Sequence, residues 1–131
     1  MLTYTRIDGI ESLATSVPVA ATGRSSTPLH HAFIRSLILS TSVRGYMSLC
    51  RVIATATEPN YAAIKVPLLI IAGSEDMTAP MAGCDAIPSK YSTIAEQKRI
   101  EVLGGVGHWH CIDAGESVAG HIKDFVLGDA T

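Results

Sequence analysis

The sequence predicts an α/β fold in which helices cover a small parallel sheet. Two apolar runs carry this prediction. Leu68–Ala72 is followed by a helix-sized segment, and Ile100–Leu103 is followed by the amphipathic segment Glu116–Leu127. Strands that alternate with helices along a chain are typical of parallel sheets joined by right-handed crossovers. A continuous apolar run such as the first one also indicates a strand that is buried on both faces.

Residues 1–64 are predicted to be helical. Apolar side chains recur at helical spacing over Ile7–Val17, and Pro18 then interrupts the pattern. After a loop of small and polar residues, Pro28 marks the start of a second helix, because proline is favoured at the first helical position. A third periodic segment ends at Glu58, next to a proline. We expect these helices to form a layer with an apolar underside.

The remaining elements lie between and after the two strands. Met81–Ile87 is a predicted short helix that Pro88 ends, and Lys90–Gln97 is a polar connection. The final helix, Glu116–Leu127, has apolar residues on one face and stops at Gly128. Two strands are too few to bury both faces of a parallel sheet, so we expect part of the sheet to be uncovered.

The composition limits what the chain can bind. At 131 residues and 13.8 kDa it is one domain at most, and 47% hydrophobic against 17% charged residues excludes a disordered tail. A net charge of −2 without a basic cluster argues against nucleic acid and anionic membrane surfaces. No apolar run is long enough to span a bilayer or to form a secretory signal. Three cysteines without framework spacing indicate reduced thiols in a cytoplasmic protein.

Each predicted strand leads into a turn that carries one residue suited to proton chemistry. Asp76 follows the first strand, and His108 lies in a glycine-rich turn after the second. Such a turn gives the imidazole freedom to reach across the edge of the sheet to the carboxylate. The pattern predicts an orienting acid and a general base.

Each of these residues also has a structural interpretation. Asp76 could cap the following helix, since aspartate is common in turns after strands. His108 could be an exposed or structural histidine. Glu75 is the neighbouring carboxylate, but side-chain alternation points it elsewhere. Together the two motifs favour the catalytic interpretation of Asp76 and His108.

Other candidates are weaker. His110 follows two residues after His108, and His-x-His with Asp76 could ligate a metal ion; no further cluster supports this, so we predict no metal site. Trp109 is expected to pack under the histidine turn. The cysteines Cys84 and Cys111 are expected to be small buried hydrophobes. For His30 and His31, on the second helix, we expect exposure or packing, with a substrate-facing role open for one of them.

Three stretches resemble the C-terminal half of an α/β-hydrolase. Val66–Pro80 resembles the strand and turn of that family's catalytic acid, with the acid four residues before a proline. Gly107–Trp109 resembles its histidine loop, and Glu116–Val126 its closing helix. The resemblance implies that residues 1–64 are a helical lid and that residues 65–131 are the C-terminal part of the hydrolase core.

Within the superfamily, the chain is most similar to 3-oxoadipate enol-lactonase-like hydrolases. The motifs that carry this similarity are Gly45-Tyr46, Cys50, Ile53-Ala54, Gly83-Cys84 and Gly105–Ile112. The similarity implies a small ester or lactone as substrate, attack by a serine, proton transfer by His108 and orientation of that histidine by Asp76. It implies no metal and no organic cofactor.

The chain departs from the family at the nucleophile. The family carries its serine on a Gly-x-Ser-x-Gly elbow before the acid, and no such elbow precedes Asp76. The segment Gly115–Ala119 comes within one residue of the motif, but it follows His108, and Ser117 lies at a helix start. The family's oxyanion loop is also missing. We therefore expect a truncated hydrolase with little activity alone. The alternative is a non-catalytic interaction module that forms a homo-oligomer, or joins a complete hydrolase, through an exposed sheet edge.

Overall fold

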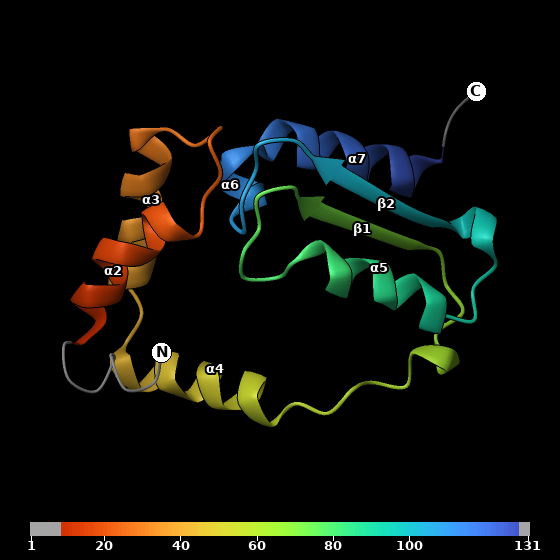
Figure 1. The fold of residues 1–131 in the computed structure, drawn as a ribbon, viewed down its shortest axis with the longest axis horizontal. Helices are drawn as coiled ribbons and strands as arrows, with labels where there is room; N and C mark the ends of the chain where they lie inside the picture. The colour runs from red at the N-terminus through yellow and green to blue at the C-terminus, as the bar shows by residue number, and fades with distance from the viewer. Residues whose placement is uncertain (1–8, 129–131) are drawn as a thin grey trace. The chain divides into compact units, whose positions relative to one another are not determined.

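The computed structural model describes residues 9–128 and divides the chain into two compact units (Figure 1). One unit comprises Met1–Ala20 and Thr27–Pro59, and the other comprises Ala21–Ser26 and Asn60–Thr131. The short segment Ala21–Ser26 therefore belongs to the unit that contains the strands, although the helices around it in sequence do not. Ile7, where we expected the first helix to begin, lies outside the described residues.

In the first unit, α2 (Gly9–Ala20) packs against α3 (Pro28–Leu39). Their buried apolar side chains form its core: Ile10, Leu13, Ala14, Ile34 and Ile38. The helix α3 begins at Pro28, as the sequence predicts, and a capping box closes its first turn. The Thr27 hydroxyl accepts the N–H of His30, and the Nδ1 atom of His30 accepts the N–H of Thr27, both at 3.3 Å. His30 thus has a structural role at the start of the helix.

The third helix, α4 (Val43–Thr55), begins at its N-cap Ser42 and ends before the predicted limit at Glu58. None of its residues is buried. Leu49, Val52 and Ile53 are all more than half exposed, at 60%, 62% and 78%. The predicted apolar underside of this helix therefore remains uncovered within the part of the chain that the structure describes.

Two prolines lie inside helices that we expected them to end. Pro18 lies within α2, and Pro88 lies within α5 (Met81–Lys90). Each proline is three residues or fewer from the end of its helix. The missing N–H there removes one main-chain hydrogen bond from a last turn, which is a smaller disturbance than in the middle of a helix.

The second unit is built on two parallel strands, β1 (Leu68–Gly73) and β2 (Lys98–Leu103). Leu68 pairs with Lys98 and Gly73 with Leu103, so β2 begins two residues before the predicted start at Ile100. Short 3₁₀ turns, η1 (Tyr61–Ala63) and η2 (Ala95–Gln97), precede the strands. The parallel arrangement predicted from the sequence is confirmed.

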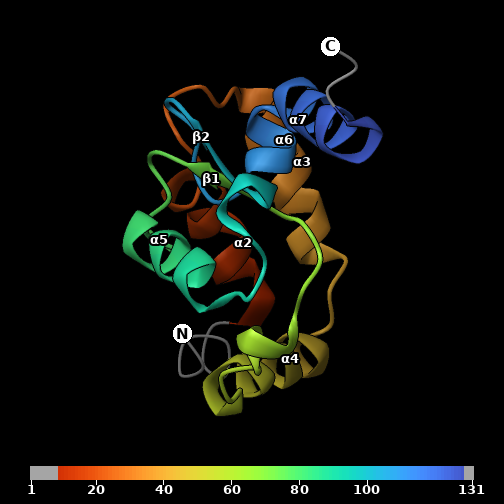
Figure 2. The ribbon, with the colours of Figure 1, turned by 90° about the vertical axis from the view of Figure 1, so that its right-hand side faces the viewer.

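Helices lie on both sides of this strand pair. Figure 2 shows α5 on one side and α7 (Gly115–Leu127) on the other, as in a parallel crossover fold. Leu103 and Val106 pack against Val118 of α7 to form the core of the unit, with Ile71 and Ala114 beside them. The short helix α6 (His110–Asp113) comes just before α7.

The strands are less buried than predicted. In β1 only Ala72 and Gly73 are buried, while the residues from Leu68 to Ile71 are partly exposed. The expectation of a strand buried on both faces is therefore wrong for the described residues. The cause is the size of the sheet: two strands with one helix on each side leave the outer edge of β1 unpaired.

Candidate active site

The two turns that follow the strands are bonded to each other through their main chains. The N–H of Ser74 donates to the carbonyl of Leu103 at 2.9 Å, and the N–H of Glu75 donates to the carbonyl of Val106 at 2.9 Å. Gly73 permits this approach, because a Cβ atom there would lie 2.3 Å from the Val106 carbonyl oxygen. The ladder between β1 and β2 thus continues past the strands and holds the two turns side by side.

This arrangement brings Asp76 and His108 together. Nδ1 of His108 lies 3.0 Å from Oδ2 of Asp76, and the Asp76 side chain is only 5% exposed while that of His108 is 42% exposed. The other carboxylate oxygen, Oδ1, accepts the N–H groups of Thr78 and Ala79 at 2.8 Å each. Asp76 therefore closes its own turn with one oxygen and holds the imidazole with the other. The alternative in which Asp76 caps the following helix is wrong, because the N-cap of α5 is Pro80 and no side chain caps that helix.

The electrostatic environment keeps Asp76 ionised. Burial raises the pKa of Asp76, but the N–H of Ala79, the ring of His108 and the N–H of Thr78 outweigh that effect, and the pKa is lowered overall. An ionised carboxylate only accepts hydrogen bonds, so Nδ1 of His108 must carry the proton of the bond that joins them. Neutral His108 then has an unprotonated Nε2, which is the atom a general base uses.

The lowered pKa makes the contribution of Asp76 to stability depend on pH. A carboxyl group with a lower pKa in the native state stabilises the fold fully above its unfolded pKa and loses that effect as the pH falls through its native pKa. We expect the difference in unfolding free energy between wild type and Asp76→Asn to shrink as the pH falls from about 5 to about 3. Urea unfolding at several pH values measures it. A difference that stays constant over this range contradicts the assignment.

A second segment is hydrogen-bonded, through its main chain, to the turn that carries His108. The N–H of His108 donates to the carbonyl of Ala21 at 2.8 Å, and the N–H of Ser25 donates to the carbonyl of Gly105 at 3.0 Å. The backbones are so close that a Cβ atom on Gly23 would lie 2.2 Å from the Gly105 oxygen. We call residues Ala21–Ser26 the bracing loop. The sequence predicts a loop here but not its contacts with the turn of His108, since a run of small polar residues has no periodic signal.

Glu75 does not reach His108. Its carboxylate accepts the N–H of Arg24 in the bracing loop at 2.8 Å and pairs with the guanidinium of that residue at 3.3 Å. The Arg24 side chain is 80% exposed, so this ion pair contributes little to stability. Glu75 thus points away from the imidazole, as alternation predicts, and connects the acid turn to the bracing loop.

The other candidate residues named from the sequence differ in how far they are exposed. Cys111 is exposed and Cys84 partly exposed, so the prediction of buried thiols is wrong for Cys111, which faces outward from α6. Trp109 is partly buried, and its Nε1 atom is fully buried. His110 lies in α6, and Ser117 is exposed in the first turns of α7.

No three His, Cys, Asp or Glu side chains within residues 9–128 gather in a way that could hold a metal ion. Over the same residues, no helix is long and apolar enough to cross a bilayer.

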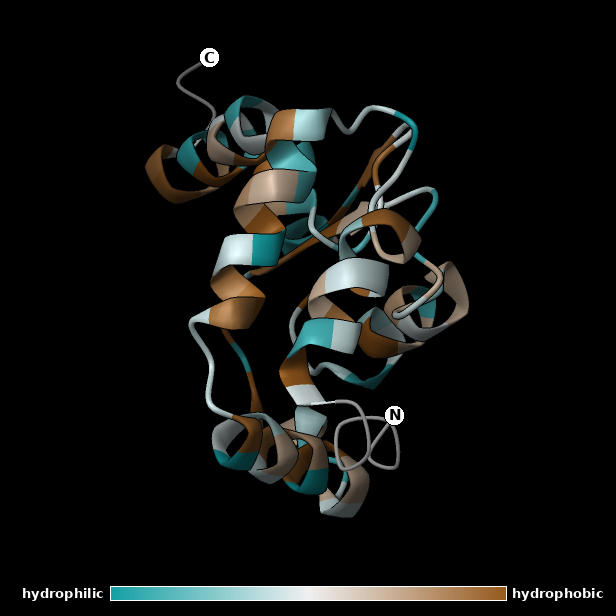
Figure 3. Cartoon of the chain, turned by 90° about the vertical axis from the view of Figure 1, so that its left-hand side faces the viewer, coloured by the Kyte–Doolittle hydropathy of each residue, from teal (hydrophilic) through white to brown (hydrophobic). Residues whose placement is uncertain are grey.

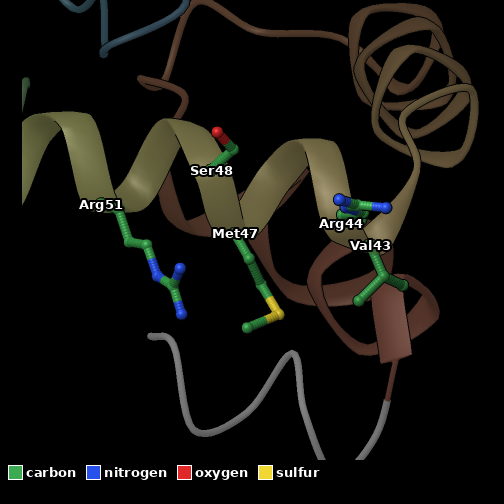
Figure 4. A pocket seen from close by; sticks show the side chains of 5 residues that line it. All are labelled: Val43, Arg44, Met47, Ser48 and Arg51. Carbon is green, nitrogen blue, oxygen red and sulfur yellow. The ribbon is translucent and has the colours of Figure 1, made fainter.

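A hollow of about 600 Å³ lies elsewhere, on α4 of the first unit (Figure 4). The described side chains that line it all belong to that helix: Val43, Arg44, Met47, Ser48 and Arg51. These side chains include no carboxylate, histidine or cysteine that could work as an acid or base beside Ser48. The hydrogen-bonded pair of Asp76 and His108, rather than this hollow, is therefore the candidate active site.

Comparison with known proteins places the fold. No protein-family model and no curated protein matches the chain. Among solved structures it is similar to the enol-lactonase from Burkholderia xenovorans LB400, with a TM-score of 0.84 and 25% identity over 96% of this chain and 48% of that one. A thermophilic esterase from Thermogutta terrifontis gives a TM-score of 0.82 and 20% identity, over 99% of this chain and 48% of that chain.

Est816, an enzyme that degrades N-acyl homoserine lactones, gives a TM-score of 0.72 and 17% identity over 94% of this chain and 49% of that chain. The chain therefore spans about half the length of the structures it matches. It has part of the α/β-hydrolase fold, and the resemblance seen in the sequence is confirmed at the level of the fold.

Proposed function

We propose that Asp76 and His108 are the acid and the base of a serine hydrolase that acts on a small ester or lactone, in the manner of 3-oxoadipate enol-lactonase-like enzymes. The observation that carries this proposal is the bond of 3.0 Å between the buried carboxylate and Nδ1 of His108. The similarity of the fold to a lactonase and to esterases supports the choice of substrate class.

In the proposed reaction, His108 moves one proton in each half of the cycle. Its Nε2 atom takes the proton of the serine hydroxyl as the oxygen attacks the carbonyl carbon, and Asp76 stabilises the imidazolium that forms. The imidazolium then gives this proton to the leaving oxygen of the ester or lactone. In the second half, Nε2 takes a proton from water as the water oxygen attacks the acyl carbon. It returns this proton to the serine oxygen as the bond between serine and the acyl group breaks and the acid is released.

The nucleophile of this reaction is proposed to come from outside residues 1–131. These residues contain no Gly-x-Ser-x-Gly elbow, and Ser117 lies on the exposed side of α7. The proposed donors for the oxyanion lie outside them as well. On this account, residues 1–131 alone hydrolyse aryl esters no faster than buffer does.

A chimaera tests the proposal. Residues 1–131 replace the matched part of the Burkholderia enol-lactonase, so that the rest of that enzyme supplies the missing elements. We expect the chimaera to hydrolyse the lactone and an aryl ester, while residues 1–131 alone show no turnover. A folded chimaera without turnover contradicts the proposal. Turnover by residues 1–131 alone that disappears in His108→Ala contradicts the claim that the nucleophile comes from outside these residues.

A second candidate is a non-catalytic interaction module. The outer edge of β1 has no partner strand within the described residues, and apolar side chains on β2 and α7 are exposed, with Val102 at 50%, Ile122 at 47% and Val126 at 71%. In Figure 3, hydrophobic and hydrophilic residues both occur along α7. Such an edge can pair with a second copy or with a hydrolase. Sedimentation velocity distinguishes the two functions: a stable monomer at micromolar concentration contradicts self-association.

A further inference from the structure

Asp113 is a buried carboxylate to which the proposed reaction gives no role. It is the last residue of α6 and is 8% exposed. Its Oδ2 atom accepts two main-chain N–H groups, from Gly107 at 3.3 Å and from Gly23 at 3.0 Å. One oxygen atom therefore joins the histidine turn to the bracing loop.

The two N–H donors belong to the two segments that Asp113 joins. Gly107 directly precedes His108, and Gly23 lies in the middle of the bracing loop. The two backbones touch, since a Cβ atom on Gly107 would lie 2.5 Å from the carbonyl carbon of Thr22. There is no room for a side chain between these segments, so a group that bonds to both must approach from the side. Asp113 does so from α6.

The position of His108 follows from these contacts. Its N–H is held by the carbonyl of Ala21, and the N–H of the residue before it is held by Asp113. The ring is 42% exposed, so packing restrains it on only part of its surface. The backbone anchors must therefore supply much of the restraint that keeps Nδ1 within reach of Asp76.

We infer that Asp113 is a positioning residue for His108: its carboxylate fixes the histidine turn against the bracing loop and so holds the imidazole at the catalytic acid. The inference rests on the proposed function, in which His108 is the base. Asp113 does not touch the substrate or the reacting atoms in this account. It acts through the main chain of Gly107.

The test uses NMR of the 131-residue chain and needs no turnover. The readouts are the exchange-protected Nδ1–H proton of His108 and the amide exchange rate of Gly107. In Asp113→Ala we expect the first to disappear and the second to rise about tenfold or more, because a local anchor is lost. In Asp113→Asn the amide oxygen can replace Oδ2 and accept both N–H groups, so both readouts should stay close to wild type.

Thr93→Ala is the matched control, since it removes a buried hydroxyl that donates to the Val66 carbonyl, near the start of β1 and away from the histidine turn. It should leave both readouts unchanged when its unfolding free energy matches that of Asp113→Ala. Equal changes in the two variants mean that Asp113 is merely structural, and they overturn the inference. If Asp113→Ala does not fold, Asp113→Glu decides, because its longer side chain must displace Gly107. An unchanged His108 signal in that folded variant also overturns the inference.

These outcomes separate the two proposals. If the wild-type chain shows the protected His108 proton and Asp113→Ala keeps it, the inference about Asp113 fails while the proposed function stands. If the wild-type chain shows no such proton, the bond between Asp76 and His108 is absent, and the proposed function itself fails.

Discussion

His108→Gln will lower kcat of the chimaera by roughly a thousandfold, because a glutamine side chain cannot take the serine proton. We expect KM to change much less, since His108 acts on the proton in the transition state rather than on the bound substrate. Asp76→Asn should also lower kcat strongly, by no more than His108→Gln does, since Asp76 acts through His108. An amide at the Oδ2 position donates to Nδ1 and forces the imidazole proton onto Nε2, where it blocks the base.

Steady-state kinetics with the lactone and an aryl ester measure these effects. The matched control is His121→Gln on α7, where the histidine is partly exposed and lies 3.9 Å from Glu101. This control should stay within about twofold of the unmodified chimaera, as surface substitutions usually do. A loss of activity in His121→Gln as large as in His108→Gln contradicts the specific role of His108.

Gly107→Ala will destabilise the fold by about 3 kcal/mol or more, since overpacking of this kind forces the backbone to shift. The added Cβ atom would lie 2.5 Å from the carbonyl carbon of Thr22 and 2.6 Å from the nitrogen of Gly23. Both are main-chain atoms, which cannot move aside as a flexible side chain can. The shift must separate the histidine turn from the bracing loop, so the variant should also lose the bond between His108 and Asp76.

Gly120→Ala is a control for which we expect the free energy of unfolding to rise rather than fall. Gly120 lies inside α7, and a Cβ atom there would have no neighbour within 4 Å. Alanine is the better helix former, so this variant should be more stable than wild type by about 0.5–1 kcal/mol. Urea unfolding measures both variants. A Gly107→Ala variant as stable as Gly120→Ala contradicts the packing described for the histidine turn.

The sequence was sufficient to predict the strands and the contact between Asp76 and His108, because both depend on local signals. The apolar run from Leu68 and the second run ending at Leu103 have the length and composition of buried strands, and their parallel pairing is confirmed. Asp76 and His108 stand directly after these strands, at the edge where the ends of parallel strands meet. Their proximity follows from that topology and from the turn that each strand enters.

The sequence could not predict the contacts that hold the histidine turn. Gly23 and Asp113 are 90 residues apart, and neither lies in a recognisable motif. Their bond depends on the path of the bracing loop within the second unit, which no periodic pattern encodes.

The expectation that Pro18 and Pro88 end their helices was wrong for a related reason. A proline signals the end of a helix, but the turn in which it lies decides whether the helix continues for a few residues.

The position of the proton on His108 tests the account most directly. Nitrogen NMR of the imidazole in the 131-residue chain can establish which ring nitrogen carries the proton when His108 is neutral. We predict a proton on Nδ1, directed at Asp76, with Nε2 unprotonated, and we predict that Asp76→Asn reverses this arrangement. A proton on Nε2, or one shared equally by the two nitrogens and insensitive to Asp76→Asn, contradicts the acid–base pair.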